Sequence, residues 1–123
     1  MSTILFHKDH GWVRVEGGLA TIGISDFAQN QMGQIIYVEL PETGRDLTAG
    51  EEFGAIESSK TTSDLIAPVS GEVLEANGSL EDDPARINSS PYEQGWIARV
   101  KLSQPSELDG LLDEAAYLQK VSG

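Results

Sequence analysis

Short apolar runs, each bounded by glycine, proline or small polar residues, recur along most of this 123-residue chain. Their lengths and their content of β-branched residues are typical of β-strands. Gly17 and Gly18 separate two of these runs, which is the spacing and composition of a two-residue hairpin turn. The pattern predicts strands over residues 12–16, 19–24, 34–40, 71–76 and 96–102. We therefore expect a mainly β protein whose neighbouring strands pair antiparallel.

Two segments depart from this pattern and predict helices. Ser25 is a capping residue before a short helix over 26–32, and Gly33 follows it at a position where a positive φ is often needed. Near the carboxyl end, apolar residues at helical spacing predict a helix over about 106–120 that packs on the sheets. Its apolar stripe consists of Leu108, Leu111, Leu112, Ala115 and Leu118. Residues 78–95 have few apolar positions and contain prolines and glycines, so they predict an irregular surface loop.

Length and composition fit a single domain over residues 1–123. Hydrophobic residues make up 39% of the chain, which is enough for a modest core. No run of 18 apolar residues is present, and residues 1–6 are too short and too uncharged for a signal peptide. We expect a cytoplasmic protein without a membrane span, or a mitochondrial matrix protein if the chain is a processed eukaryotic form.

The excess of acidic residues excludes some classes of partner. Twenty Asp and Glu against eight Lys and Arg give a formal net charge of −12, which repels nucleic-acid phosphates and anionic lipid surfaces. We expect neither nucleic acid nor membranes as partners, and we expect partner proteins to present basic patches. Cysteine is absent, so any sulfur chemistry would have to come from an attached group.

No motif predicts a catalytic site or a metal site. The two histidines, His7 and His10, lack the further ligands that zinc needs, and the sequence identifies no orienting partner for either ring. The chain contains neither a standard glycine-rich phosphate loop nor a Gly-x-Ser-x-Gly motif. The acidic pairs Glu51-Glu52 and Asp82-Asp83 are expected to be solvated charges.

Lys60 lies at the centre of a predicted β-hairpin over about residues 51–68. A cluster of Ser and Thr separates two short apolar runs there, and neither run has a helical repeat, so Lys60 should be exposed at the tip. Glu57 and Asp64 nearby are acidic, whereas a nucleophilic lysine is usually activated by desolvation or by a neighbouring cation. Schiff-base catalysis is therefore disfavoured. Two interpretations remain: an ordinary solvated lysine, or a lysine that another enzyme modifies.

Residues 57–64 (Glu-Ser-Ser-Lys-Thr-Thr-Ser-Asp) and 67–73 (Ala-Pro-Val-Ser-Gly-Glu-Val) resemble the H-protein family of the glycine cleavage system. Further segments resemble the family and occur in its order, namely residues 20–24, 38–41, 88–92 and 95–96. The resemblance covers nearly the whole chain. It implies a flattened β-sandwich or barrel of the lipoyl-carrier type, with a short internal helix and a carboxy-terminal helix, in which Gly71 serves the fold.

The resemblance also implies a cofactor and four partner enzymes. Lipoic acid would be amide-linked to Lys60 by a lipoate-attaching enzyme, with Glu57, Ser59, Thr61 and Asp64 around the attachment point. The arm would take an aminomethyl group from a pyridoxal-phosphate glycine decarboxylase, the P-protein, and deliver it to a tetrahydrofolate-dependent aminomethyltransferase, the T-protein. Dihydrolipoyl dehydrogenase, the L-protein, would reoxidise the dithiol. The resemblance therefore implies a monomeric carrier rather than an enzyme.

The chain departs from the family pattern at a few positions. Residues 10–12 read His-Gly-Trp, where the family usually has His-Glu-Trp. That glutamate is associated with a cleft that shelters the loaded arm, so the resemblance implies weaker sheltering here unless Asp9 or Asp64 supplies the charge. Ser59 and Thr61 replace the more usual Val and Ala, which could alter recognition by the lipoate-attaching enzyme.

Three other classes of function stay open on the sequence. The chain could be an H-like lipoyl protein that serves lipoate relay or another lipoate-dependent system. It could be a carrier of another complex, although a biotin acceptor usually has methionines beside its lysine and a minimal lipoyl domain lacks the additional terminal segments. It could also be an unmodified acidic interaction module. Intact-mass measurement would separate the last class from all carriers.

Overall fold

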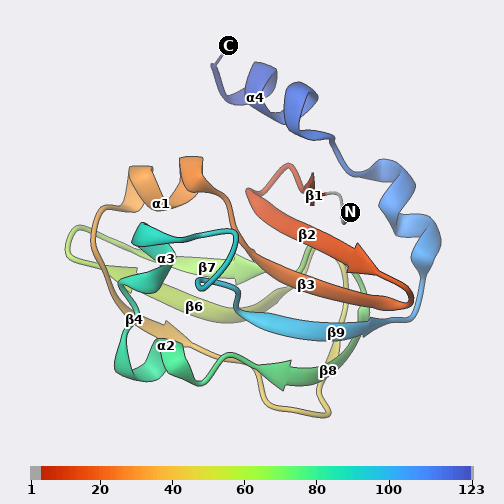
Figure 1. The fold of residues 1–123 in the computed structure, drawn as a ribbon, viewed down its shortest axis with the longest axis horizontal. Coiled ribbons are helices and arrows are strands. Elements are labelled where there is room, and N and C mark those ends of the chain that lie inside the picture. Colours follow the sequence, from red (N-terminus) through yellow and green to blue (C-terminus); the bar gives the residue numbers. More distant parts are fainter. Residues whose placement is uncertain (1–3, 123) are drawn as a thin grey trace.

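The computed structural model describes residues 4–122, and the ends of the predicted domain, residues 1–3 and 123, lie outside this range. Within it, the backbone forms two antiparallel sheets that face each other, with short helices at their margins (Figure 1). This arrangement confirms the predicted mainly β sandwich. The apolar core lies between the sheets and includes Ile22 and Val100 of one sheet and Val38 and Ile56 of the other, all nearly inaccessible to solvent.

The larger sheet of the described residues has six strands in the order β1-β2-β3-β9-β8-β5. Their bounds are β1 Ile4–Phe6, β2 Gly11–Glu16, β3 Leu19–Ile24, β5 Asp46–Leu47, β8 Gly71–Ala76 and β9 Ala98–Leu102. The smaller sheet has three strands in the order β4-β6-β7, with bounds β4 Ile35–Glu39, β6 Glu52–Ser58 and β7 Thr62–Ile66. All the longer predicted strands are present, whereas the short strands β1 and β5 were not predicted.

The helical elements of the described chain are short. Their bounds are α1 Asp26–Met32, α2 Ser79–Asp82, α3 Arg86–Ser89, the 3₁₀ helix η1 Pro105–Gly110, and α4 Glu114–Ser122. Helix α1 begins where predicted, because the Ser25 side chain accepts a hydrogen bond from the Ala28 amide at 3.2 Å. It ends at Gly33, whose φ of +83° also agrees with the prediction of a positive φ.

The prediction of an irregular loop over residues 78–95 was wrong. Helices α2 and α3 form within it, and each is fixed by one apolar side chain, Leu80 in α2 and Ile87 in α3, that is completely buried. The segment has few apolar positions, but these two positions reach the core. Burial of a leucine or isoleucine side chain contributes about 1.5–3 kcal/mol, which offsets the low helix propensity of the surrounding residues.

The prediction of one helix over about 106–120 was also wrong. The 3₁₀ helix η1 ends at Gly110, and Leu112 then pairs with Phe6 through two backbone hydrogen bonds of 2.7 and 2.8 Å. This pairing interrupts the helical phase before α4 begins. As a result Tyr117 faces the core at 1% exposure, whereas Leu118, which was assigned to the apolar stripe, is 53% exposed.

Gly71 occupies a position where the backbones of two strands approach closely. It is buried at the start of β8, and a Cβ placed on it would overlap the backbone carbonyl of Lys101 in β9. Because that obstacle is backbone rather than a flexible side chain, any residue larger than glycine would force the strands apart. The structural role that the resemblance implied for Gly71 therefore has a direct steric cause.

Candidate functional site

Strands β6 and β7 form the predicted hairpin, and Lys60 lies in the turn between them. Glu57 is opposite Thr62 in the antiparallel register, so the turn comprises residues 58–61. Residues 59–61 are exposed, and the turn projects from the body of the molecule beside α1 and β4 (Figure 1). The sequence prediction of an exposed lysine at a hairpin tip is confirmed.

Ser58 gives the tip a fixed backbone geometry. Its side chain is 4% exposed, and its Oγ accepts hydrogen bonds from the amides of Lys60 at 3.2 Å and Thr61 at 3.1 Å. The Ser58 backbone amide in turn donates to the Thr61 carbonyl at 2.8 Å. A serine that bonds backbone groups two and three residues further along stabilises a turn. The exposed lysine therefore projects from an ordered turn.

The tip is also attached to the connection between α1 and β4. The Ser59 amide donates to the Gln34 carbonyl at 3.0 Å. The aliphatic stem of Lys60 lies along Gly33, where a Cβ would come within 3.1 Å of the lysine Cε. Behind this connection, the Asn88 side chain donates to the Gly33 carbonyl at 2.9 Å and accepts from the Ile35 amide at 2.8 Å. The absence of a side chain at Gly33 therefore lets the aliphatic part of Lys60 pack against the backbone there.

The other predicted site residues occupy two different places. Ser59 and Thr61 flank Lys60 in the turn and are exposed. Glu57 is exposed on β6, where it pairs in register with Tyr37 of β4. Asp64 lies further along β7 and lines a cleft next to that strand. Lys60, Ser59 and Thr61 therefore form the tip, Glu57 lies on the adjoining sheet surface, and Asp64 belongs to the cleft.

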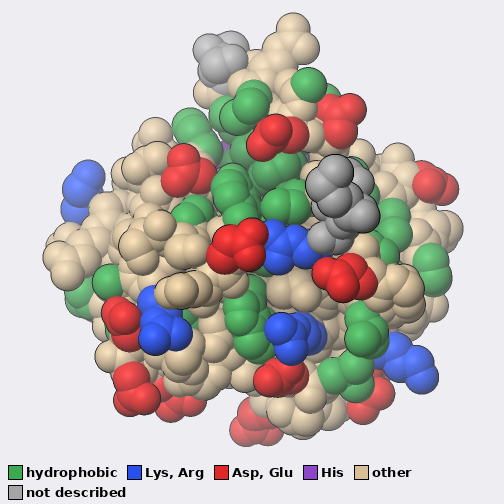
Figure 2. All heavy atoms as spheres, viewed as in Figure 1, with side chains coloured by type: hydrophobic (Ala, Val, Ile, Leu, Met, Phe, Trp, Pro, Cys, Tyr) green, Lys and Arg blue, Asp and Glu red, His purple; other side chains and the backbone are tan. Residues whose placement is uncertain are grey.

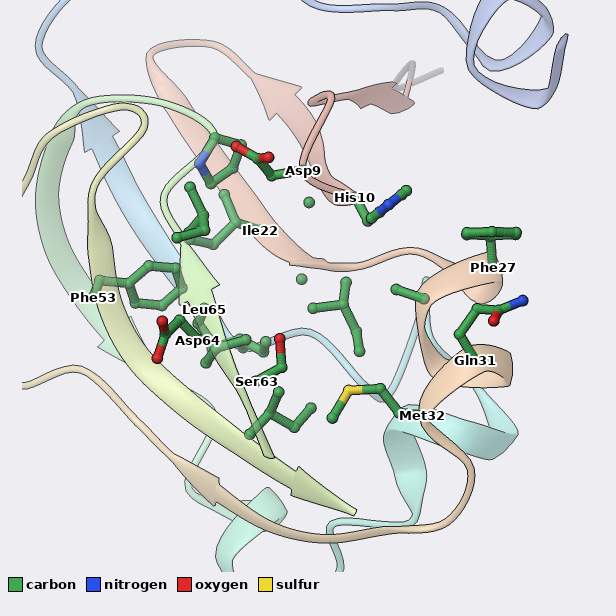
Figure 3. Close-up of a pocket in the computed structure, with 18 residues that line it drawn as sticks. Asp9, His10, Ile22, Phe27, Gln31, Met32, Phe53, Ser63, Asp64 and Leu65 are labelled. Atoms are coloured by element: carbon green, nitrogen blue, oxygen red, sulfur yellow. The ribbon is translucent and has the colours of Figure 1, made fainter. Parts of the chain in front are cut away.

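The cleft has a volume of about 220 Å³ and is enclosed by segments distant in sequence. It lies between β7, α1 and the turn that precedes β2 (Figure 3). Apolar side chains supply most of its wall, including Phe27 and Met32 of α1 and Phe53, Ile56 and Leu65 of the hairpin. Met32 extends from α1 towards the middle of the cleft (Figure 3). Such a cleft suits an apolar chain rather than a phosphate or a sugar.

Asp9 and Asp64 are the acidic residues among those that line the cleft, one in the turn before β2 and the other in β7. Figure 3 shows the Ser63 hydroxyl directed into the cleft and the Asp64 carboxylate directed to the opposite side of β7. Gly11 also lines the cleft without contributing a side chain. A Cβ on Gly11 would lie 3.4 Å from the Pro68 Cβ, which is ordinary van der Waals contact, so the position accepts a Cβ without a clash. The cleft itself is therefore mainly apolar, and Asp9 is the acidic residue at its edge, with its carboxylate 3.3 Å from Nδ1 of His7.

The imidazole of His10 stands at the same cleft and faces Phe27, with ring centroids 5.2 Å apart (Figure 3). Its Nδ1 lies 2.7 Å from the Tyr117 hydroxyl, which is an orienting partner that the sequence did not identify. Desolvation by burial lowers the pKa of His10 below its usual value, and Lys120 acts in the same direction while Asp9 opposes it. The lowered pKa favours the uncharged ring.

Sequence reasoning missed Ser58, Gly33 and Asn88, although each orders the tip. Ser58 carried a usable signal, because Ser or Thr at the end of a strand often bonds the backbone of the following turn. Gly33 was interpreted only as the end of α1, and Asn88 lay within the segment predicted as an irregular loop. No local signal could place Asn88 beside residues more than fifty positions earlier in the chain.

Acidic side chains are spread over the face shown in Figure 2 and alternate with Lys and Arg, rather than forming one patch.

Across residues 4–122 no three His, Asp or Glu side chains form a group that could hold a metal ion. No helix in the same part of the chain is long and apolar enough to cross a membrane.

Comparisons with known proteins match this chain over nearly its full length. Residues 4–123 match the family model described as glycine cleavage H-protein. A "Glycine cleavage system H protein" of Parvibaculum lavamentivorans is 50% identical and aligns over 98% of this chain and 97% of its own. The "Glycine cleavage system H protein" of Symbiobacterium thermophilum is 54% identical, and the alignment covers 91% of this chain and 88% of that protein. The "Glycine cleavage system H protein, mitochondrial" of Oryza sativa subsp. indica is 52% identical, and the alignment covers 94% of this chain and 73% of that protein.

The fold leads to the same family. The crystal structure of a glycine cleavage system H protein from Mycobacterium marinum superposes with a TM-score of 0.90 at 35% sequence identity, and the match covers 98% of both chains. Sequence, fold and the exposed lysine at an ordered hairpin tip thus agree, and the chain belongs to the glycine cleavage H-protein family.

Proposed function

We propose that this protein is the lipoyl-bearing carrier of a glycine cleavage system and that Lys60 is the attachment residue. The main observation in support is that Lys60 is exposed on a turn whose backbone is fixed by hydrogen bonds to Ser58 and Gln34. Lipoate attachment by amide formation needs a lysine that a second enzyme can reach, and an ordered, protruding tip meets that need. Family membership supports the same residue.

The residues at the tip fit a long apolar arm. Gly33 leaves the space beside the Lys60 stem open, and a Cβ there would lie against the lysine Cε. Ser59 and Thr61 are small and exposed, so the active site of a lipoate-attaching enzyme can approach the backbone on both sides of Lys60. Glu57 and Asp64 provide negative charge near the tip for a partner with a basic surface.

The arm would supply the sulfur chemistry that a chain without cysteine lacks. We propose that it accepts the aminomethyl group of glycine from the pyridoxal-phosphate decarboxylase, the P-protein, and delivers it to the tetrahydrofolate-dependent aminomethyltransferase, the T-protein. Dihydrolipoyl dehydrogenase, the L-protein, then restores the disulfide of the arm. On this proposal the chain itself presents, shelters and releases the cargo, and it is not an enzyme.

The cleft is proposed as the place where the loaded arm is sheltered from water. Met32 and Ser63 line it, and they lie within three residues of Gly33 and Lys60 respectively, so the cleft begins close to the base of the tip. Its apolar wall suits the hydrocarbon part of the arm. Asp9 at the edge of the cleft would attract the cationic amino group, which compensates in part for the carboxylate that Gly11 does not supply.

The proposal is tested by incubating the purified protein with lipoate, ATP and a lipoate-attaching enzyme, followed by intact-mass measurement and peptide mapping. We expect the addition of one lipoyl group, located on Lys60. The modified protein should then support glycine-dependent turnover with the P-, T- and L-proteins, whereas the unmodified protein should not. Attachment to another lysine, or equal turnover of both forms, would contradict the proposal.

A further inference from the structure

The hydroxyl of Tyr117 in α4 joins two side chains that lie far from it in sequence. It is 2.7 Å from Nδ1 of His10 and 2.6 Å from Oγ of Ser25. Tyr117 is 1% exposed and Ser25 is completely buried, so water does not compete for these hydrogen bonds. The Tyr117 ring also stacks on Phe6 with centroids 4.5 Å apart. One side chain therefore connects the carboxy-terminal helix to the segment before β2 and to the start of α1.

His10 is held in a backbone conformation that histidine adopts infrequently. Its φ is +75°, and it is the one non-glycine residue with a positive φ in the described part of the chain. The His10 amide donates to the His7 carbonyl at 2.9 Å, and the His10 carbonyl accepts from the Ser25 amide at 2.8 Å. Such a conformation persists when surrounding contacts fix it, and the Tyr117 hydroxyl is the contact that fixes the ring.

Both partners of Tyr117 lead to the cleft. His10 lines the cleft and faces Phe27. Ser25 caps α1 through the Ala28 amide, and α1 supplies Phe27, Ala28, Gln31 and Met32 to the cleft wall. Through Tyr117, helix α4 therefore contacts residues that hold two walls of the cleft in place, the wall from α1 and the wall from the turn before β2. No α4 residue lines the cleft itself.

We propose that Tyr117 is a positioning residue of the cleft, so that the carboxy-terminal helix takes part in sheltering the loaded arm. This inference rests on the proposed carrier function. The hydrogen bonds form a consistent series when the Ala28 amide donates to Ser25, the Ser25 hydroxyl donates to Tyr117, and the Tyr117 hydroxyl donates to Nδ1 of His10. The neutral ring then carries its proton on Nε2, which fixes both its orientation and its donor.

The groups that face His10 support a neutral ring in this role. Burial and Lys120 lower its pKa, and Asp9 acts in the opposite direction. Phe27 and Tyr117 contact the ring from α1 and α4. A neutral imidazole avoids placing a second cation beside the amino group of the cargo. The Tyr117 contact and the burial of the ring both favour this neutral form of His10, which is the form that suits the sheltered cargo.

The first test uses the unmodified full-length protein and Tyr117→Phe, which keeps the ring and removes only the hydroxyl. In nitrogen-15 NMR spectra, we expect the wild-type His10 ring to be the Nε2-protonated form and the variant to show a mixture of tautomers. Hydrogen exchange of the Ala28 amide should become roughly 2- to 10-fold faster, because its acceptor Ser25 loses its own hydrogen bond to Tyr117. An unchanged tautomer and an unchanged exchange rate would overturn the proposal.

Two comparison variants separate positioning from general loosening. Tyr92→Phe removes another hydroxyl that contacts α1, since the Tyr92 oxygen accepts from the Asp26 amide at 2.9 Å. It should speed exchange at the start of α1 without changing the tautomer of His10. Tyr37→Phe alters an exposed tyrosine on β4 and should change neither measurement. A tautomer change in Tyr92→Phe equal to that in Tyr117→Phe would show that Tyr117 has no special role.

The second test measures sheltering. The aminomethyl-loaded arm decays when water displaces the cargo, which breaks the carbon–sulfur and carbon–nitrogen bonds and yields the thiol, formaldehyde and ammonium. Formaldehyde release should be roughly 2- to 10-fold faster in Tyr117→Phe and in His10→Asn, because asparagine tolerates a positive φ but lacks the imidazole. Equal release rates in wild type and both variants would overturn the proposal. Failure of Lys60 to accept lipoate would instead contradict the carrier function and leave the NMR result valid.

Discussion

The tip and the cleft differ in how the chain builds them. The tip is made of four consecutive residues, 58–61, and its turn is fixed mainly by hydrogen bonds of the Ser58 side chain and backbone within that segment, with one bond from the Ser59 amide to Gln34. The cleft takes residues from positions 9 to 97, and its walls are the same side chains that form the core, such as Ile22, Ile56 and Leu65. The exposed side chains of the tip, at residues 59–61, can therefore change with little effect on stability, whereas most of the cleft side chains cannot.

Substitutions at the exposed tip should therefore alter function without altering stability, whereas substitutions in the cleft wall should alter both. Lys60 is exposed and buries little area, so the fold should not depend on its side chain. Cleft residues such as Leu65 and Ile56 are buried, and their truncation would cost about 2–5 kcal/mol whatever happens to the arm. Informative cleft variants are those at its polar rim, where Asp9, Gly11 and Asp64 lie.

The largest expected functional effect comes from Lys60→Arg. Arginine keeps the positive charge, but its guanidinium does not lose its proton in proteins and cannot serve as the amine in amide formation. Lipoylation and glycine-cleavage turnover should fall to background, while the unfolding midpoint stays within a few degrees because surface substitutions usually cost less than about 0.5 kcal/mol. Intact mass and thermal unfolding measure the two outcomes. A large loss of stability would show that the tip is structural.

The largest expected effect on stability comes from Gly71→Ala, at a position remote from the tip. The new Cβ would overlap the Lys101 carbonyl, so strands β8 and β9 must separate, at a cost of about 1–3 kcal/mol or more. Lys60 should still accept lipoate at temperatures where the variant is folded. Gly18→Ala is the matched control, because a Cβ there meets nothing within 4 Å. Equal urea midpoints for both variants would contradict this assignment.

A smaller effect is expected at the cleft rim from Gly11→Glu. The position accepts a Cβ without a clash, and a carboxylate there should add attraction for the cationic cargo of about 0.2–1 kcal/mol, as for other partly exposed ion pairs. Formaldehyde release from the loaded arm should slow by about 1.5- to 5-fold. Gly11→Gln supplies the same shape without the charge and should lie close to wild type. If the Glu and Gln variants behave alike, charge does not hold the cargo.

The smallest expected effect is the pH dependence contributed by His10. Burial lowers its folded-state pKa below the unfolded value of 6.5, so the folded state favours the neutral ring. The resulting stability is fully present above pH 6.5 and is lost as the pH falls from there through the folded-state pKa. Urea unfolding of wild type and His10→Asn at pH 7.5, 6.5 and 5.5 should show a difference that narrows towards low pH. A constant difference would mean that titration of His10 is not coupled to folding.

Local sequence signals predicted much of the fold. The Gly17-Gly18 pair correctly separated β2 from β3, and Ser25 with Gly33 correctly bounded α1. The Ser and Thr cluster around Lys60 correctly indicated an exposed turn. These features depend on φ preferences, capping and strand periodicity, which act over a few residues and are therefore readable from the chain itself.

The carboxy-terminal segment shows where local signals failed. Its apolar spacing favoured one helix, but pairing of Leu112 with Phe6 and burial of Tyr117 against His10 and Ser25 divided it in two. The two short helices within residues 78–95 arose in the same way, from the burial of Leu80 and Ile87. In each case, contacts with residues far along the chain outweighed a weak local preference.

The sequence by itself determined the longer strands and the hairpin with an exposed Lys60 at its tip, because strand periodicity and turn chemistry act locally. Only the tertiary structure decided that an apolar cleft lies beside β7, that Gly33 and Asn88 support the tip, and that Tyr117 reaches His10. Those features require residues up to 107 positions apart to meet. Their pairing depends on how the two sheets pack, which no local pattern of residues encodes.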